Sequence, residues 1–342
     1  METNDRIKTY FLPGTGELPL VAEPQEKDPL RADFNRTLAW LSENRESMKN
    51  TLHRQGAILF RGFPVNSPAR FEAFVKAIDD NLMKYVGGTS DREKIEGNVY
   101  SSTTTPSYFK MALHHEMAYR AETPSKIFFY CHTAPPKDGQ TIIADGRKIL
   151  ADIDPEIRRK FESSKVRFQR RLLNLTPFKA LLARTSRMFR MISWQQVHQT
   201  SDRSRVEAIL KEQGYQYEWD KSGNLTFWTS LSAIESHPET GEKVWFRPVH
   251  FFHFNPRIYG RTIYWLMRAY EMLTRSPSTR LHFENGDLAD DRDISQVIDS
   301  LEKNEIYFDW KKGDVLCLDN RLIAHGRNRY RGDRKIMVLM TR

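Results

Sequence analysis

The stretch Gly313-Asp-Val-Leu-Cys-Leu-Asp-Asn-Arg-Leu-Ile-Ala-His325 has the pattern of two buried segments separated by a polar break. The glycine and aspartate at its start are typical of a turn, and Val315–Leu318 has the length and composition of a buried strand. Asp319-Asn320 interrupts the apolar run, and the next three apolar residues return the chain to the core just before His325. The pattern predicts a mainly β core that presents a histidine on a strand.

A second group of candidate ligands lies far earlier in the chain, in Leu113-His-His-Glu-Met117. If 110–118 is a strand, residues i and i+2 share one of its faces. His114 and Glu116 can then converge on a single ion, while His115 points to the opposite face. A lone His-x-Glu is more often a solvated strand edge, because so short a pattern arises frequently by chance. The distal histidine and the arginine beyond it give the pattern its weight.

His114, Glu116 and His325 together provide two imidazoles and one carboxylate. Non-haem Fe(II) enzymes use this ligand set on one face of an octahedral site, which leaves the opposite positions open for reactants. We therefore predict that these three residues bind Fe(II) and form the catalytic centre.

Two further candidate site residues, Arg334 and Thr141, each follow a predicted turn. After the polar turn 331–333, Arg334 begins an apolar strand that runs to Met340. In isolation, Arg334 is an ordinary surface charge at a strand start. A dicarboxylate co-substrate that chelates the metal needs a planar two-donor partner for its remote carboxylate, and arginine supplies one whereas lysine does not. Thr141, in Gly139-Gln-Thr141, either adds a hydroxyl donor to that acid or is an ordinary β-branched strand residue.

These motifs resemble the Fe(II)/2-oxoglutarate dioxygenases of the taurine dioxygenase superfamily, specifically its clavaminate synthase-like branch. The resemblance covers most of the chain, from about residue 50 to 342. The matching stretches are 56–63, 113–119, 135–145, 237–246, 313–320 and 325–327. It implies Fe(II) ligands at His114, Glu116 and His325, and 2-oxoglutarate contacts at Thr141 and Arg334. It also implies a double-stranded β-helix (jelly-roll) core with flanking helices.

Two positions depart from the usual pattern of this branch. His115 stands where the branch usually has asparagine, and Arg247 follows Val244-Trp-Phe246 where asparagine is again usual. We expect both positions near the substrate pocket, so the substrate cannot simply be transferred from the family. The carboxylate is retained as Glu116, whereas related halogenases replace it with a small residue so that chloride binds iron. The sequence therefore argues against halogenation.

The composition is that of a soluble enzyme, with 39% hydrophobic and 12% aromatic residues, which suffice for a large core. The length allows two domains, but barrels of this size are often one domain with insertions, and we predict a single domain over 1–342. The N-terminus has no signal-peptide pattern, and no apolar run is long enough to span a membrane. Cys131 and Cys317 lie in strand-like runs and are expected to be buried thiols, which fits a reducing cytoplasm.

Within this domain we expect an N-terminal arm over about 1–30 and a helical, basic insertion over about 155–215. The net charge of +9 is compatible with an acidic partner or substrate. Much of the excess lies between Lys165 and Arg190, where cations alternate with apolar side chains. This segment has three interpretations: a solvated helical insertion, a lid over the active-site mouth, or a nucleic-acid or membrane patch. We favour the solvated insertion, and expect no nucleic-acid or membrane partner.

The predicted function is that of an Fe(II)/2-oxoglutarate-dependent dioxygenase that consumes O2 and releases succinate and CO2. The resemblance implies hydroxylation of an unactivated C–H bond in an amino acid or amino-acid-derived substrate of specialised metabolism, free or tethered to an acidic carrier protein. Within the enzyme class, the alternatives are oxidation of a small anion such as a sulfonate, and desaturation or cyclisation. Two further alternatives are a dioxygenase that acts on nucleic acid and a binding or sensor module without turnover. We expect a cytoplasmic protein, and the sequence leaves its oligomeric state open.

Overall fold

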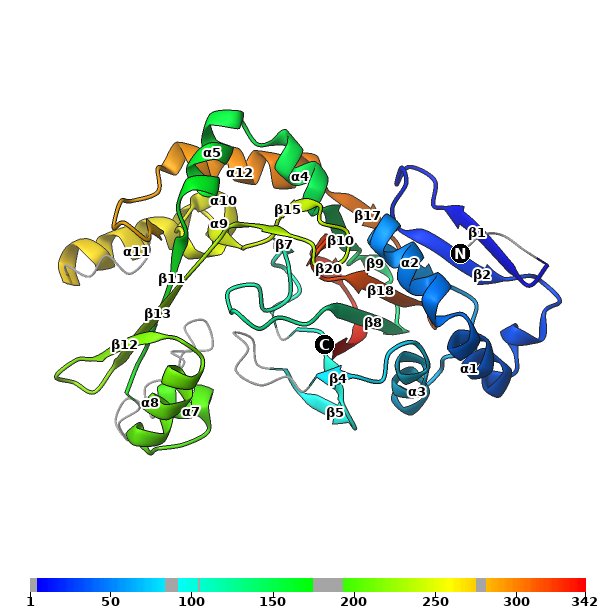
Figure 1. Cartoon of the computed structure of the whole chain (residues 1–342). Coiled ribbons are helices and arrows are strands. Elements are labelled where there is room, and N and C mark those ends of the chain that lie inside the picture. Colours follow the sequence, from blue (N-terminus) through cyan, green and yellow to red (C-terminus); the bar gives the residue numbers. More distant parts are fainter. Residues whose placement is uncertain (1–4, 84–91, 104, 175–192, 275–280) are drawn as a thin grey trace.

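Two β-sheets, built mostly from antiparallel strands, form the centre of the protein (Figure 1). The computed structural model describes residues 5–83, 92–103, 105–174, 193–274 and 281–342. The larger sheet contains, in spatial order, β1 (Ile7–Phe11), β2 (Leu20–Pro24), β3 (Ala57–Phe60), β18 (Val315–Asp319), β8 (Lys126–Thr133), β21 (Lys335–Thr341), β6 (Val99–Ser101) and β5 (Lys94–Glu96), with β4 (Leu82–Met83) paired to β21. The N-terminal segment thus contributes two strands, and β2 pairs with β3 in parallel.

The smaller sheet carries most of the predicted site residues. Its order is β17 (Ile306–Phe308), β10 (Thr141–Asp145), β19 (Ile323–Arg327) and β7 (Met111–His114). Side chains from the two sheets meet in one buried cluster, to which Phe129 and Leu316 contribute from the larger sheet and Ile143 and Ile323 from the smaller. This is the mainly β, jelly-roll arrangement predicted from the sequence.

The continuous apolar run of β18 is explained by its place between two cores. Every residue of the strand is buried. Val315 and Cys317 pack into the core beneath the N-terminal helices, whereas Leu316 and Leu318 pack into the core between the sheets. Because successive side chains of a strand point to opposite faces, a strand covered on both sides must be apolar throughout.

Helices cover the outer faces of both sheets (Figure 1). The cluster on the outside of the larger sheet includes side chains of α1 (Phe34–Glu43), α2 (Arg45–Gln55) and α3 (Pro68–Ile78). The cluster on the outside of the smaller sheet includes side chains of α4 (Gly146–Asp152), α5 (Pro155–Ser163) and α12 (Asp291–Lys303). The core therefore has four layers, with the two sheets between two sets of helices.

The basic insertion contains a strand where a helix was expected. Val166–Leu172 forms β11, which pairs with β13 (Leu225–Leu231) and β16 (His282–Phe283), and β12 (Gln216–Trp219) completes this sheet. The helical expectation is wrong here because Val166, Phe168 and Leu172 are buried with the two-residue period of a strand. Two short helices, α7 (Trp194–His198) and α8 (Arg203–Glu212), follow. The rest of the basic run, from Lys179 to Arg190, lies outside the described residues.

The remaining elements are short, apart from one helix. They are the 3-10 turn Pro29–Arg31, β9 (Lys137–Asp138), β14 (Ile234–Ser236), β15 (Lys243–Trp245), α9 (Val249–Phe252), α10 (Pro256–Tyr259), α11 (Arg261–Thr274) and β20 (Tyr330–Arg331). Cys131 and Cys317 are both free and buried, as predicted. In the ranges that the structure describes, no helix combines the length and apolar character needed to cross a bilayer.

Candidate metal centre

His114 and His325 face each other across two neighbouring strands. His114 is the last residue of β7, His325 lies within β19, and the antiparallel register makes the two residues direct partners. Directly opposed side chains in such a pair start only about 5 Å apart at their Cβ atoms. The two imidazole centroids are 4.5 Å apart, so both rings reach a common point.

Glu116 lies in a turn, not in the strand that was expected to carry it. The strand ends at His114, and Met117 adopts a φ of +54°, which is incompatible with an extended chain. The fully buried Asn320 holds this turn. Its Oδ1 accepts the Glu116 N–H at 2.7 Å, and its Nδ2 donates to the carbonyls of Glu116 (3.1 Å) and Pro124 (2.9 Å). Glu116 therefore lies near the two histidines because Asn320, which follows β18, holds the turn by hydrogen bonds. It does not share a strand face with His114, as had been expected.

The three predicted ligands form one cluster, in which Glu116 and His325 are buried and His114 is partly buried. Each of His114, Glu116 and His325 has a ligand atom within 4.8 Å of those of the other two. Nδ1 of His114 lies 3.0 Å from the carbonyl of Ala112. Since a carbonyl only accepts, we assign the ring proton to Nδ1, which leaves the Nε2 lone pair available to a metal. Burial lowers the pKa of His114 to about 4, so the imidazole is neutral at neutral pH.

Glu116 is ionised although it is buried. Burial by itself raises the pKa of this carboxyl, but the Arg92 guanidinium and the His325 imidazole outweigh that effect and hold the pKa well below its usual value. Nδ1 of His325 is buried and accepts or donates no hydrogen bond within the described residues. Two imidazoles and an ionised carboxylate, brought together out of solvent, fit a divalent first-row metal such as Fe(II).

The cluster lines a cavity of about 560 Å³. This is the size of a small-molecule site, and such sites combine an apolar lining with a few convergent polar groups. The apolar part of the lining includes Phe109, Phe129, Phe251, Phe252, Ile258, Ile263 and Ile336. The polar part contains Thr141 and Arg334, so the cavity brings all five predicted site residues together.

Thr141 and Arg334 are both held in defined orientations. The Thr141 hydroxyl accepts a hydrogen bond from the indole N–H of Trp310 at 2.9 Å, which leaves its own O–H as a donor. Nε of Arg334 donates to the carbonyl of Gly139 at 3.0 Å. Burial, reinforced by the charge of Arg327, lowers the pKa of Arg334 to about 10, and the guanidinium stays protonated at neutral pH.

His115 lies beside the cluster but is not one of its members. It is buried, and its ring lies 4.9 Å from that of Phe246, centroid to centroid. Burial lowers its pKa well below the usual value, so its ring is neutral. His115 contributes to the cavity lining without joining the potential metal ligands.

Arg247, the second unusual position, supports the Glu116 turn from behind. Its buried guanidinium donates to the carbonyls of Ala118 and Arg120, each at 2.6 Å, and forms an ion pair with Glu235. These contacts fix the backbone just after the carboxylate. The role of Arg247 is therefore in positioning the turn, which sequence reasoning had not anticipated.

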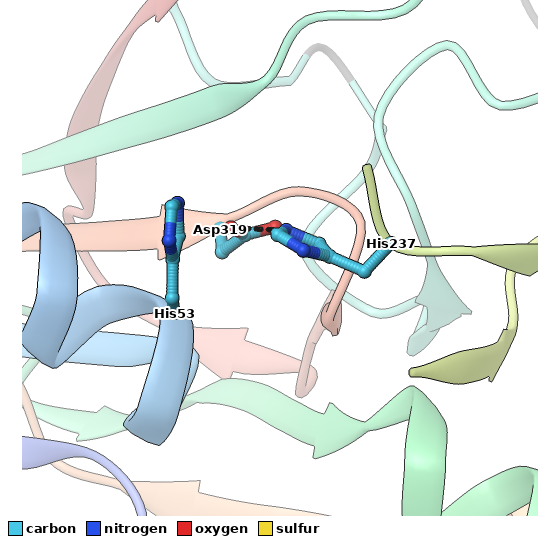
Figure 2. A group of neighbouring side chains, drawn as sticks. All are labelled: His53, His237 and Asp319. Carbon is cyan, nitrogen blue, oxygen red and sulfur yellow. Dashed lines mark hydrogen bonds and ion pairs between the residues drawn. The ribbon is translucent and has the colours of Figure 1, made fainter. Parts of the chain in front are cut away.

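Figure 2 shows a second group of potential ligands, His53, His237 and Asp319, of which His237 and Asp319 have a structural role. Nδ1 of His237 accepts two backbone N–H groups from the following turn, at 3.3 and 3.1 Å, so the ring proton is on Nε2 and is donated to Asp319 at 3.0 Å. A metal-bound histidine keeps one nitrogen lone pair for the metal and donates its other N–H, whereas His237 has no lone pair left. Asp319 also accepts the N–H groups of residues 321 and 322, and thereby fixes the turn between β18 and β19.

The sequence is similar to those of known proteins. The model of the family described as "Taurine catabolism dioxygenase TauD, TfdA family" matches residues 17–341. Dapdiamide synthesis protein DdaC of Enterobacter agglomerans is 30% identical over 290 residues, which cover 84% of this chain and 83% of the relative. A clavaminate synthase-like protein of Arabidopsis thaliana is 28% identical over 295 residues, covering 85% and 83%.

The fold is also found among solved structures. PvcB of Pseudomonas aeruginosa superposes with a TM-score of 0.55 at 12% identity, over 99% of this chain and 92% of that chain. A structural similarity at such low sequence identity supports the jelly-roll fold alone. Membership of the family rests on the match to the family model. The protein belongs to the TauD, TfdA family of dioxygenases.

Proposed function

We propose that His114, Glu116 and His325 bind Fe(II), and that Thr141 and Arg334 bind 2-oxoglutarate. The chain is an Fe(II)/2-oxoglutarate-dependent dioxygenase of the TauD family. The observation that carries the residue assignment is the convergence of two imidazoles and an ionised carboxylate on the wall of one cavity. A hydroxyl donor and a guanidinium in the same cavity suit the remote carboxylate of a dicarboxylate co-substrate.

The protein's part in the reaction is to orient the reactants and to exclude water. When bound, iron supplies the activation of O2 that is coupled to conversion of 2-oxoglutarate into succinate and CO2. His114 and His325 would hold the metal through their imidazoles, of which that of His114 is neutral at neutral pH, and the hydrogen bonds of Asn320 keep Glu116 in reach of them. Arg334 and Thr141 hold the far end of the co-substrate. The phenylalanine and isoleucine side chains of the cavity cover the site and leave a dry space for an unactivated C–H bond.

The substrate that we propose is an amino acid or amino-acid-derived compound of specialised metabolism, and the reaction is hydroxylation. The relatives support a biosynthetic role, because one is a dapdiamide synthesis protein and PvcB is described as an Fe, alpha-ketoglutarate dependent oxygenase from an isonitrile synthetic pathway. The retained carboxylate of Glu116 favours oxygen insertion over halogenation. Desaturation and cyclisation use the same iron chemistry and differ in the product.

The test is turnover with a panel of amino acids, offered free and as carrier-protein thioesters. The protein is loaded anaerobically with Fe(II) and 2-oxoglutarate, exposed to O2, and assayed for O2 uptake, succinate and product mass. Hydroxylation adds one oxygen atom to the product, whereas desaturation or ring closure removes two hydrogen atoms. Glu116→Ala should lose succinate formation, and the exposed Lys335→Gln should retain it. Undiminished succinate formation by Glu116→Ala would show that the ligand assignment is wrong.

A further inference from the structure

One segment of the chain forms a continuous apolar surface in the cavity, beside the candidate metal centre. It runs through α9 and α10 into the first turn of α11. We call its lining residues the apolar wall, and they are Pro248, Phe251, Phe252, Ile258, Tyr259 and Ile263. Phe251 brings this surface to the metal ligands, because its ring centroid lies 5.7 Å from that of His114, in an edge-to-face arrangement.

Hydrogen-bond donors of the apolar wall are used within the same segment. The Tyr259 hydroxyl donates to the carbonyl of Phe251 at 2.8 Å, and burial raises its pKa to about 12, so it stays protonated. The backbone N–H of Phe251 donates to the carbonyl of Pro248 at 3.0 Å. The N–H groups of Ile258 and Tyr259 donate to the carbonyl of Asn255, each at 3.2 Å. These donors are therefore not available to a polar group of a bound substrate.

The charged side chains of the cavity come from other segments. They are Arg92, Lys110, Glu116, Arg327 and Arg334. The cavity is thus divided into a charged part, which contains the proposed metal and co-substrate residues, and an apolar part next to it. A polar or ionic group placed against the apolar wall loses its water and finds little to replace it, whereas a hydrocarbon group gains free energy from burial there.

We propose that the apolar wall binds a hydrocarbon side chain of the substrate. The inference rests on the proposed function and narrows its substrate class to amino acids, or compounds derived from them, that have an aliphatic or aromatic side chain. Because Phe251 lies beside His114, the side chain held by the apolar wall is the part of the substrate that contains the oxidised C–H bond. A small sulfonate, or an amino acid with a polar side chain, fits this surface poorly.

Four small compounds test this subsite without knowledge of the substrate. The protein is loaded anaerobically with Co(II) and 2-oxoglutarate, and leucine, phenylalanine, asparagine or taurine is titrated while the visible Co(II) absorption is followed. The first three are offered free and as ethyl thioesters, so that both free and tethered substrates are represented. Leucine or phenylalanine should bind saturably in at least one form, about tenfold or more tightly than asparagine, which has nearly the shape of leucine but a polar amide. Taurine should bind no better than asparagine.

Substitutions in α11 test the position of the subsite. Ile263→Asn places a polar side chain in the apolar wall and should weaken binding of the apolar compound by about tenfold. Ile263→Ala shortens the side chain without adding a polar group and should weaken it by about threefold. The Co(II) and 2-oxoglutarate midpoints of both variants should stay near those of the wild type, which also shows that the variants are folded. The matched control is Leu266→Asn, because Leu266 is 57% exposed on the same helix and lies outside the cavity lining; it should leave binding unchanged.

Three results would overturn the proposal. If neither leucine nor phenylalanine binds in either form, or if asparagine or taurine binds as tightly, the cavity does not select a hydrocarbon side chain. Equal binding by the wild type and both Ile263 variants places the subsite elsewhere. An equal loss in Leu266→Asn and Ile263→Asn shows a general effect on α11 and no direct contact. Failure of the proposed function is recognised separately, because wild-type protein would then bind no Co(II) or 2-oxoglutarate before any of the four compounds is added.

Discussion

Replacing Asn320 by alanine should damage the metal centre although Asn320 is not a proposed ligand. The side chain is fully buried and makes three hydrogen bonds, two to the backbone of Glu116 and one to the carbonyl of Pro124. Asn320→Ala removes all three and leaves one N–H and two carbonyl groups without this partner. The turn that carries the carboxylate then loses its link to the end of β18.

The expected cost follows from these groups. A buried polar group that loses its partner costs roughly 1–3 kcal/mol, and partial relaxation or entry of a water offsets part of the sum. We therefore expect the free energy of unfolding of the metal-free protein to fall by about 3–5 kcal/mol. Metal affinity should fall by roughly ten- to a hundredfold, as for other losses of groups that orient a metal ligand.

Urea unfolding and anaerobic Co(II) titration measure the two effects. The matched control is Asn304→Ala, which removes side-chain hydrogen bonds to Asp152 (2.8 Å) and to the carbonyl of Ser300 (2.9 Å) at the end of α12. This control should lower stability and leave Co(II) affinity unchanged. If Asn320→Ala binds Co(II) as tightly as the control, then Asn320 does not position Glu116, and the explanation given for the turn is refuted.

Three further changes test other parts of the site and of the fold. His115→Ala should retain Co(II) binding, because the ring packs against Phe246 and its nitrogens are not among the clustered ligand atoms; loss of the metal in a titration would mean that His115 is a ligand. Arg334→Gln should raise the 2-oxoglutarate midpoint about ten- to a hundredfold with little change in Fe(II) affinity, whereas the exposed Lys335→Gln should behave as wild type; the reverse outcome would move the anion site to Lys335. Burial by itself raises the pKa of Asp79. Lys126, 2.8 Å away, and further hydrogen bonds outweigh this effect, so the pKa lies below its ordinary value of 3.8. The stabilisation by Asp79 is therefore complete above about pH 4 and is lost as the pH falls through the folded-state pKa. Asp79→Asn should flatten the acid limb of stability against pH, and the exposed neighbour Asp80→Asn should not; equal acid limbs for Asp79→Asn and wild type would contradict this.

The fold could be predicted where a local run of apolar residues corresponds to a strand that is buried in the structure. The apolar run before Asp319 reads as a buried strand because both faces of β18 are covered, and the next apolar residues return the chain to the core before His325. The strand β11 was not predicted, because its segment was expected to be helical. Basic residues alternate with its apolar residues, so the sequence alone does not distinguish a strand from a helix. The structure shows that Val166 and Phe168 are buried and that the strand pairs with β13.

The sequence grouped the three candidate ligands that the structure brings together, but it did not reveal the residues that position them. Asn320 contacts Glu116 across 204 positions of sequence, and no local pattern encodes a contact of that range. The Asp319-Asn320 pair between two buried runs was a usable signal, because buried polar side chains require hydrogen-bond partners. Arg92 and Arg247 gave no comparable signal, since cations outside a motif are usually solvated. The strand-face argument grouped His114 with Glu116 correctly, although the structure achieves this grouping with a turn.

The most direct test of the metal centre is the metal-to-ligand charge-transfer band that forms when 2-oxoglutarate chelates Fe(II) in the absence of O2. The wild-type protein, titrated anaerobically with both, should develop this band in the visible spectrum. His114→Ala, Glu116→Ala and His325→Ala should not develop it at the same concentrations, while their far-UV circular dichroism stays that of the wild type. A band of wild-type intensity and midpoint in any of these three variants would contradict the assignment of His114, Glu116 and His325 as the iron ligands.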